Sequence, residues 1–342
     1  MYYWQDEPEA IECIASYERG HNYDPGPNPM LLSEYLPVST LTLKRTPVPK
    51  AKFPLIDGHH HMHSVKLEDL PAGVKLMDDM NIQSIVNLDG GTTLSCVKRS
   101  IDCLDRTYPG RFFTYCNIET PDIDAPDFES HMRAFVTEGA KYGVRGLKLL
   151  KEMGLKFRDS KGELILPDDD RLRFIWELAA KLGLPVLYHI ADPLAFFRPN
   201  DGSNERVEPL WQHPDWHFYG PGVPTFEQMM ECQERLLENN PDTTFILPHA
   251  ASRTENLASL DALLERYGNF YIDISARAGD LSKTPYSSRK FLIKHAGRTL
   301  FGLDGPLVRR FYEVFFRILE TDDEYFNYKN EENRMAPGAR YS

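Results

Sequence analysis

The chain has 342 residues, of which 42% are hydrophobic and 26% are charged. These values are typical of soluble globular proteins and argue against a largely disordered chain or one built from membrane spans. The formal net charge of -12 makes nucleic acid or an anionic membrane surface an unfavourable partner. The five cysteines are scattered and odd in number, as expected of reduced thiols in a reducing compartment. We therefore expect a cytoplasmic protein, unless a leader precedes the first residue.

The two ends of the chain differ in composition from the rest. Residues 1–50 are rich in proline, tyrosine and acidic groups, and they are predicted to form an irregular N-terminal arm. Residues 51–326 are predicted to form one large domain. A polar C-terminal tail follows over residues 327–342.

From Phe53 onward, short apolar runs alternate with segments of helical spacing. About eight runs are strand candidates, and they lie near residues 53, 83, 112, 144, 185, 244, 270 and 299. Helices are predicted between them, at Leu67–Met80, Glu129–Tyr142, Asp170–Leu182, Thr225–Glu238, Asn256–Tyr267 and Ser287–His295. Strands separated by helices require a parallel sheet, and eight such units favour an α/β fold of the (β/α)8 TIM-barrel type. An open, doubly wound sheet is the alternative, although the phosphate-binding motifs GxGxxG and GxxxxGK[ST] are missing from the sequence.

Two connections between the predicted strands are longer than the others. The polar segment 151–169 follows the strand near 144 and is predicted to hold a small hairpin, and a longer insert, 191–224, follows the strand near 185. In a TIM barrel such loops lie at the carboxyl ends of the strands, where active sites are found. The longer insert is therefore a candidate lid or pocket wall. The alternative is a packed surface loop without substrate contact.

The strand near residue 53 ends in the histidine-rich sequence DGHHHMH. Because side chains alternate along a strand, Asp57, His59 and His61 are predicted to share one face. Two imidazoles on one face can chelate a single metal ion. In the rival register His61 and His63 would form the pair.

Three further ligand-type residues stand at the ends of later strands. His189 ends the strand near 185, His249 follows the strand near 244, and Asp304 follows the strand near 299. A barrel would bring these strand ends together at one face. Three imidazoles and a carboxylate suit a zinc-type ion that keeps one position for a water molecule, which the ion activates.

With these residues in place, the sequence resembles the amidohydrolase superfamily, in its amidohydrolase-related (amidohydrolase 2) branch. That branch includes metal-dependent decarboxylases similar to aminocarboxymuconate semialdehyde decarboxylase, and some lactone hydrolases. The D-x-H-x-H motif of the first strand is matched by Asp57, His59 and His61. The fifth-strand and sixth-strand histidines are matched in VLYHI and FILPHA, and the closing motif F-G-[TS]-D-x-P corresponds to FGLDGP at 301–306.

The resemblance implies a role for each of these residues. His59, His61 and His189 would bind one divalent metal ion, expected to be Zn²⁺ with Mn²⁺ or Fe²⁺ as alternatives. Asp304 would be a further metal ligand or the base that takes a proton from the bound water. His249 would polarise the substrate or carry a proton.

Several polar and aromatic residues are candidates for substrate contacts. Lys148 lies near the end of the fourth strand, where some superfamily members hold two metals bridged by a carboxylated lysine. We instead expect one metal, with Lys148 as an inward-facing charge that orients the substrate; a buried structural ion pair is the alternative. Arg277 and Arg198 are candidates for holding a substrate carboxylate, and Trp216 is a candidate for lining the cleft. For each of the three, an exposed loop residue without a function is the alternative.

Two carboxylates are predicted to support the ligand histidines without binding the ion, namely Asp57 and Asp192. The sequence also departs from the family pattern after the sixth strand. Relatives usually show H-x-G there, whereas His249 is followed by Ala-Ala-Ser at 250–252. We therefore expect a different local turn.

These observations predict a metal-dependent hydrolase, in which metal-activated water attacks an amide, ester or lactone carbonyl of a small, carboxylated organic molecule. Non-oxidative decarboxylation of an aromatic or enoic acid is the second hypothesis, because the resemblance covers both chemistries and a fold does not choose between them. A non-catalytic metal-binding or ligand-binding barrel is the third. The expected partner is a small-molecule substrate, with homo-oligomerisation left open.

Overall fold

The computed structural model describes residues 40–63 and 65–326. The chain divides into two units, Met1–Leu41 and Thr42–Ser342, and every helix and strand of the described residues lies in the second. Most of the predicted N-terminal arm and all of the predicted tail lie outside the described residues. No helix in the described ranges is both long and apolar enough to cross a membrane.

The strands lie where the apolar runs predict them, and every pairing between them is parallel. A first group contains β1 (Leu55–His60), β2 (Ile82–Asn87) and β3 (Phe112–Thr114). A second group contains β4 (Cys116–Asn117), β5 (Leu147–Leu149), β6 (Val186–Tyr188), β7 (Phe245–Leu247), β8 (Phe270–Asp273) and β9 (Thr299–Leu300), paired in chain order.

Backbone hydrogen bonds join the two groups into a ring. β3 and β4 are halves of one extended run interrupted at Tyr115, whose N donates to Asn87 O over 2.9 Å. At the other seam, Gly58 N donates to Phe301 O over 2.9 Å and Asp304 N donates to His59 O over 2.8 Å. The eight strand runs therefore close into a (β/α)8 TIM barrel, which confirms the predicted fold and excludes the open sheet.

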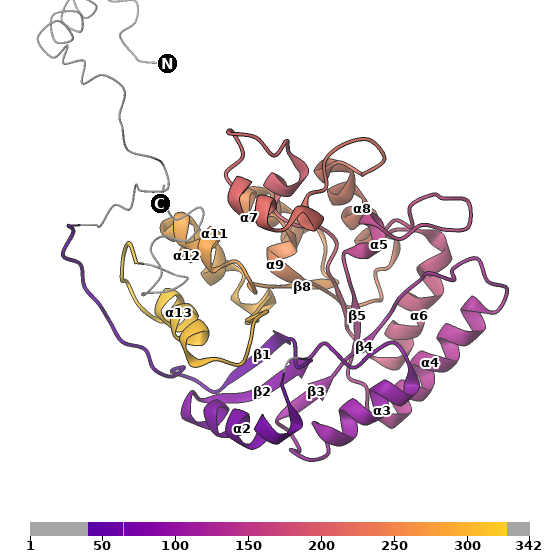
Figure 1. Cartoon of the computed structure of the whole chain (residues 1–342), viewed down its shortest axis with the longest axis horizontal. Coiled ribbons are helices and arrows are strands. Elements are labelled where there is room, and N and C mark those ends of the chain that lie inside the picture. The colour runs from indigo at the N-terminus through magenta and orange to yellow at the C-terminus, as the bar shows by residue number, and fades with distance from the viewer. Residues whose placement is uncertain (1–39, 64, 327–342) are drawn as a thin grey trace, which may run out of the picture. The chain divides into compact units, whose positions relative to one another are not determined.

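The helices follow the strands and surround them (Figure 1). Each predicted helix is present, as α2 (Leu70–Asp79), α4 (Phe128–Tyr142), α6 (Arg173–Leu182), α8 (Phe226–Asn239), α10 (Leu257–Arg266) and α12 (Pro285–Lys294). Two long helices were not predicted, α3 (Leu94–Cys103) and α13 (Arg309–Glu320). The shorter helices are α5 (Glu152–Leu155), α7 (Val207–Gln212), α9 (Pro248–Ala251) and α11 (Ala278–Lys283).

Side chains from the strands fill the barrel, and side chains from strands and helices together fill the layer around it. Leu88, Tyr115, Leu187 and Ile246 form a buried cluster to which no helix contributes, as expected for residues that point into a barrel. Larger clusters of buried apolar residues combine strand and helix side chains. This packing holds the strand ends in fixed relative positions.

Both long connections have structure of their own. In the segment after β5, Asp159 N donates to Glu163 O over 2.9 Å and Ile165 N donates to Phe157 O over 3.0 Å, so the predicted small hairpin is confirmed. The insert after β6 contains the short helices η3 (Leu194–Phe197), α7 and η4 (Pro214–Trp216). Its apolar residues Phe196, Phe197, Leu210 and Phe218 are buried in the main core, so the insert is packed against the barrel.

Candidate metal centre

Two histidines from the first strand and one carboxylate from the last connection meet at the barrel seam. His59 lies within β1, His61 follows it directly, and Asp304 follows β9. The Nε2 atoms of His59 and His61 lie 3.6 Å and 3.4 Å from Asp304 Oδ1. Gly302 permits this approach, because a Cβ atom on it would lie 2.6 Å from the Cβ of His59.

The other ring nitrogen of each histidine is held by a second carboxylate. His59 Nδ1 lies 2.8 Å from Asp273 Oδ2, and His61 Nδ1 lies 2.7 Å from Asp89 Oδ1. With Nδ1–H donated to a carboxylate, Nε2 is the ring nitrogen of each histidine that faces Asp304, and it is the nitrogen that would bind an ion. Metal-binding histidines are typically held in this way. The donor atoms of His59, His61 and Asp304 therefore fit a divalent metal ion.

Asp273 and Asp89 were not predicted from the sequence. Asp273 is the last residue of β8, and Asp89 follows β2 by two residues. Asp273 is fully buried and also accepts hydrogen bonds from His249 N over 2.9 Å and from Ser275 Oγ over 2.6 Å. The rule that selected the histidines, a polar residue at the carboxyl end of a strand, would also have selected both aspartates.

His249 and His189 lie beside this group. His249 Nε2 is 3.7 Å from Asp304 Oδ2, and its Nδ1 is 2.9 Å from the Ser275 carbonyl oxygen. The ring of His189 lies 4.4 Å from the His249 ring, measured between centroids. Its Nε2 is turned toward Ala191 O at 3.1 Å and Asp192 Oδ1 at 3.4 Å, so Nδ1 is the ring nitrogen left to bind an ion. His189 therefore does not share the close Nε2 cluster of the other two predicted ligands.

The turn that carries His249 has an unusual backbone. His249, Ala250, Ala251 and Ser252 have consecutive φ values of 58°, 53°, 53° and 57°, all in the left-handed region. For residues with a Cβ atom this conformation costs about 1–2 kcal/mol each. The turn is held by Ser252 Oγ, which donates to Ala191 O, and by Gln233 Nε2, which donates to Ala251 O over 3.2 Å.

Burial and the neighbouring groups shift the pKa values of Asp304, His61 and His249. Burial opposes ionisation of Asp304, but the hydrogen bond from His61 and the interaction with His59 hold its pKa well below the usual range. Burial would lower the pKa of His61, yet its bonds to Asp304 and Asp89 raise that pKa to about 9. Burial lowers the pKa of His249 well below its ordinary value. Asp304 is therefore a carboxylate and His249 a neutral imidazole near neutral pH.

Lys148 lies inside the barrel near these charges. It belongs to β5 and is 1% exposed. Burial lowers its pKa to about 8, against the opposing effect of the Asp304 and Asp273 charges. Its Nζ makes no hydrogen bond or ion pair with any residue that the structure describes. The buried structural ion pair considered above is therefore not found in the described ranges.

The remaining predicted contacts lie in different surroundings. Arg277 is buried and engaged by the protein, with Nε 3.4 Å from His249 O and 3.8 Å from Asp280 Oδ2. The side chain of Arg198 is 58% exposed and lies 4.0 Å from Glu227. Trp216 stacks on His213, with ring centroids 4.0 Å apart. Among the described residues, none of these three side chains makes a hydrogen bond, ion pair or ring contact with His59, His61 or Asp304.

Asp57 stabilises the barrel seam through buried hydrogen bonds. It is fully buried and accepts hydrogen bonds from Tyr312 Oη over 2.6 Å, from Leu303 N over 3.0 Å and from His59 N over 3.1 Å. Burial raises its pKa to about 7 against these hydrogen bonds. Asp57 thus joins β1, the connection after β9, and α13.

The other histidines of the motif take different positions. His60 is fully buried on the opposite side of β1, and neither ring nitrogen has a hydrogen-bond partner among the described residues. His63 has a side chain that is 71% exposed, with Nδ1 3.0 Å from Asp89 Oδ2. The structure therefore places His59 with His61 at Asp304, and His63 at the rim.

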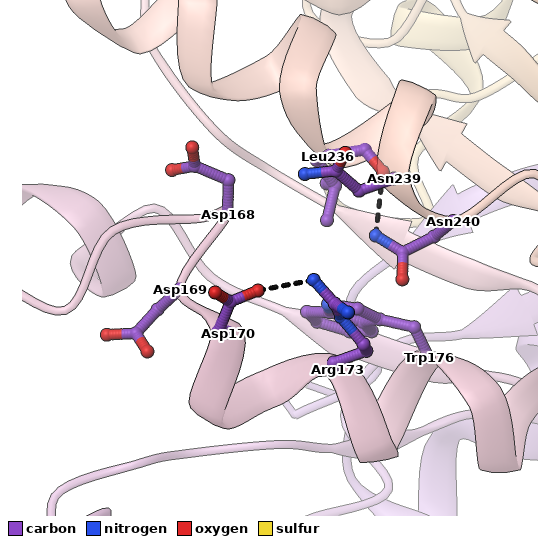
Figure 2. A pocket seen from close by; sticks show the side chains of 8 residues that line it. All are labelled: Asp168, Asp169, Asp170, Arg173, Trp176, Leu236, Asn239 and Asn240. Carbon is purple, nitrogen blue, oxygen red and sulfur yellow. Dashed lines mark hydrogen bonds and ion pairs between the residues drawn. The ribbon is translucent and has the colours of Figure 1, made fainter.

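A small pocket lies away from this cluster, where aspartates 168 to 170 face α6 and α8 (Figure 2). Its aspartates are already paired: Asp170 with Arg173 at 2.5 Å, and Asp168 with Arg235 at 2.5 Å. It shares no residue with the candidate metal centre, and we assign it no role.

Comparison with known proteins gives a consistent result. The amidohydrolase family model matches residues 109–324. An uncharacterised TIM-barrel protein from Bordetella bronchiseptica is 16% identical, with a TM-score of 0.50 over 78% of this chain and 91% of that one. The 5-carboxyvanillate decarboxylase of Novosphingobium aromaticivorans, solved with manganese, is 12% identical, with a TM-score of 0.50 over 82% of this chain and 94% of that one. A 2,6-dihydroxybenzoate decarboxylase is 17% identical, with a TM-score of 0.49 over 77% and 92%. No curated protein matches.

The fold and the donor cluster define a barrel of the metal-dependent hydrolase type. The chain belongs to the amidohydrolase family, in the amidohydrolase-related branch that the motifs indicated. Members of this family are metal-dependent enzymes, hydrolases or decarboxylases, that act on small molecules. The protein is therefore an enzyme of this class, and at these identities the solved structures speak only for its fold.

Proposed function

We propose that the protein is a metal-dependent hydrolase of a small, carboxylated amide, ester or lactone, with the ion bound by His59, His61 and His189. The convergence of two imidazole Nε2 atoms on Asp304, each imidazole held by its own carboxylate, carries this proposal. A divalent ion, with zinc expected and manganese or iron as alternatives, would supply Lewis-acid activation of water and of the substrate carbonyl.

Asp304 is the proposed general base. Its low pKa keeps it ionised near neutral pH, and its carboxylate stands between the Nε2 atoms of three histidines. It would take a proton from the attacking water at Oδ2, the oxygen nearer to His249. Asp304→Asn should therefore abolish turnover while leaving much of the metal in place.

His249 is the proposed proton carrier. Its Nδ1–H donates to the Ser275 carbonyl, so the lone pair of the neutral ring lies on Nε2, facing Asp304 Oδ2. This nitrogen can receive the proton that Asp304 has taken and deliver it to the leaving group. The buried hydrogen bonds at Nδ1 and at the backbone nitrogen keep the ring in this orientation.

Lys148 is the proposed contact for the substrate carboxylate. An ammonium group buried without a direct ion pair is costly, and among the described residues Lys148 makes no ion pair or hydrogen bond, although the charges of Asp304 and Asp273 act on it from a greater distance. A carboxylated substrate would supply the missing charge beside the donor cluster.

The same lysine favours a second candidate, decarboxylation of an aromatic or enoic acid. A carboxylate held by Lys148 next to the ion would itself be the group that leaves. The 5-carboxyvanillate decarboxylase, which shares the fold, carries out chemistry of this kind. Release of carbon dioxide in place of uptake of water separates the two reactions.

The first experiment is elemental analysis of the purified protein with His59→Ala and His189→Ala alongside. His131→Ala, an exposed histidine of α4, is the matched control. We expect about one ion per chain, lost in both variants and kept in the control. Lactones, esters, amides and aromatic acids are then screened with the loaded enzyme. A parent without metal after reconstitution would refute the proposal.

A further inference from the structure

The orientation of His189 is set by groups outside the donor cluster. Its Nε2 faces Ala191 O and Asp192 Oδ1. A hydrogen atom on Nε2 is therefore donated to these oxygens, which leaves the lone pair on Nδ1. Asp192 and the Ala191 carbonyl together thus favour Nδ1 as the ring nitrogen of His189 that can bind an ion.

Asp192 in turn depends on a lysine from another connection. Its second oxygen, Oδ2, accepts a hydrogen bond from Lys151 Nζ, and Asp192 is buried. Lys151 stands two residues after β5, whereas Asp192 follows β6. A buried carboxylate without a counter-charge is costly. Lys151 therefore supplies the counter-charge for Asp192 and holds its carboxylate in place.

Lys151 also contacts the aromatic wall of the insert after β6. Its Nζ lies 5.9 Å from the centre of the Trp216 ring and 5.6 Å from that of Phe218. These distances allow cation–π attraction. Among the described residues, the aspartates that hold His59 and His61 make no ion pair or hydrogen bond with a lysine or arginine side chain. The Lys151 arrangement is therefore particular to His189.

We propose that Lys151 is a positioning residue for the metal centre. Through Asp192 it fixes the orientation and tautomer of His189, and through Trp216 and Phe218 it couples the insert to that ligand. The inference rests on the proposed function, because it requires His189 to bind the ion.

The test measures metal binding and not turnover. Lys151→Met removes the charge and keeps the length of the chain, while Lys151→Arg keeps the charge. Lys156→Met is the matched control, because Lys156 lies on the same connection but faces Glu152 at 4.0 Å. Each protein is titrated with Zn²⁺ against a competing chelator, and the visible absorption of the Co²⁺-substituted form is recorded.

We expect Lys151→Met to weaken Zn²⁺ binding by about 10–100-fold and to change the Co²⁺ bands. Lys151→Arg should restore most of the affinity, and Lys156→Met should leave it unchanged. If Lys151→Met does not fold, Asp192→Asn, which keeps the side-chain volume, carries the same expectation.

Two results would count against the inference in different ways. If Lys151→Met binds Zn²⁺ as tightly as the parent and keeps its Co²⁺ spectrum, Lys151 has only a structural role, even where thermal stability falls. A parent protein that binds no metal would instead refute the proposed metal centre, and the inference with it.

Discussion

Replacing Tyr312 by Phe should destabilise the protein at the barrel seam. Tyr312 and Asp57 are fully buried, and the Tyr312 hydroxyl donates to Asp57 Oδ2 over 2.6 Å. Without that hydroxyl, the donors to Asp57 within the described part of the chain are two backbone nitrogens, from His59 and Leu303. Because burial raises the pKa of Asp57 to about 7, unfolding is measured at pH 8, where the carboxylate is mostly ionised, and a hydrogen bond to a charged group contributes about 1.5–3 kcal/mol. We expect the free energy of unfolding to fall by that amount.

The loss can be measured by urea unfolding and by the thermal midpoint, which should fall by about 3–8 °C in a domain of this size. Tyr108→Phe is the matched control, because its hydroxyl makes no hydrogen bond to a described residue. A double-mutant cycle with Asp57→Asn isolates the pair. If Tyr312→Phe costs no more than Tyr108→Phe, or costs as much beside Asp57→Asn as in the parent, the assigned hydrogen bond does not stabilise the seam.

Three further predictions concern the site and the thiols. Lys148→Met should raise KM for a carboxylated substrate by about 10–100-fold, because one ion pair to the substrate is lost, and it should leave the metal content intact. An unchanged KM would show that Lys148 does not bind the substrate. Asp273→Asn should weaken Zn²⁺ binding by about 10–100-fold in a chelator competition, and parent-like affinity would contradict its role in holding His59. Burial raises the pKa of Cys116 and of Cys232 to about 12, so at pH 8 a maleimide should label the exposed Cys96 before either of them. Peptide mass spectrometry measures the labelling of each cysteine, and equal labelling rates for the three would show that the core opens freely.

The sequence predicts the barrel well because short apolar runs that alternate with segments of helical spacing are a strong signal of strands and helices in alternation. It misses α3 because only Val97 and Ile101 are buried in that helix, which gives a weak apolar stripe. It also misses α13, although FYEVFF contains a helical face. The stripe of Tyr312, Phe315 and Phe316 was available in the sequence.

The site is predicted only in part. Strand alternation places His59 with His61 and separates His60, because that rule depends on local geometry alone. The rule says nothing about which ring nitrogen faces inward, and this is why the position of His189 relative to the cluster could not be anticipated. Ring orientation depends on partners such as Asp192, which only the folded chain brings into place. Arg198 could not be placed either, since it lies on an insert without periodicity.

The hydrogen bonds across the seam also bear on how the chain folds. Leu303 N and Asp57 Oδ1 are 246 residues apart in sequence, and loops of that length are slow to close. His59 and His61 stand on one side of this contact and Asp304 on the other. In a folding intermediate with most strands paired but the ring still open, His59 and His61 would not yet be close to Asp304. The metal site would therefore be incomplete. Catalytic activity would then appear only in the last step of folding, when the ring closes. The circular dichroism signal of the helices and strands would appear earlier.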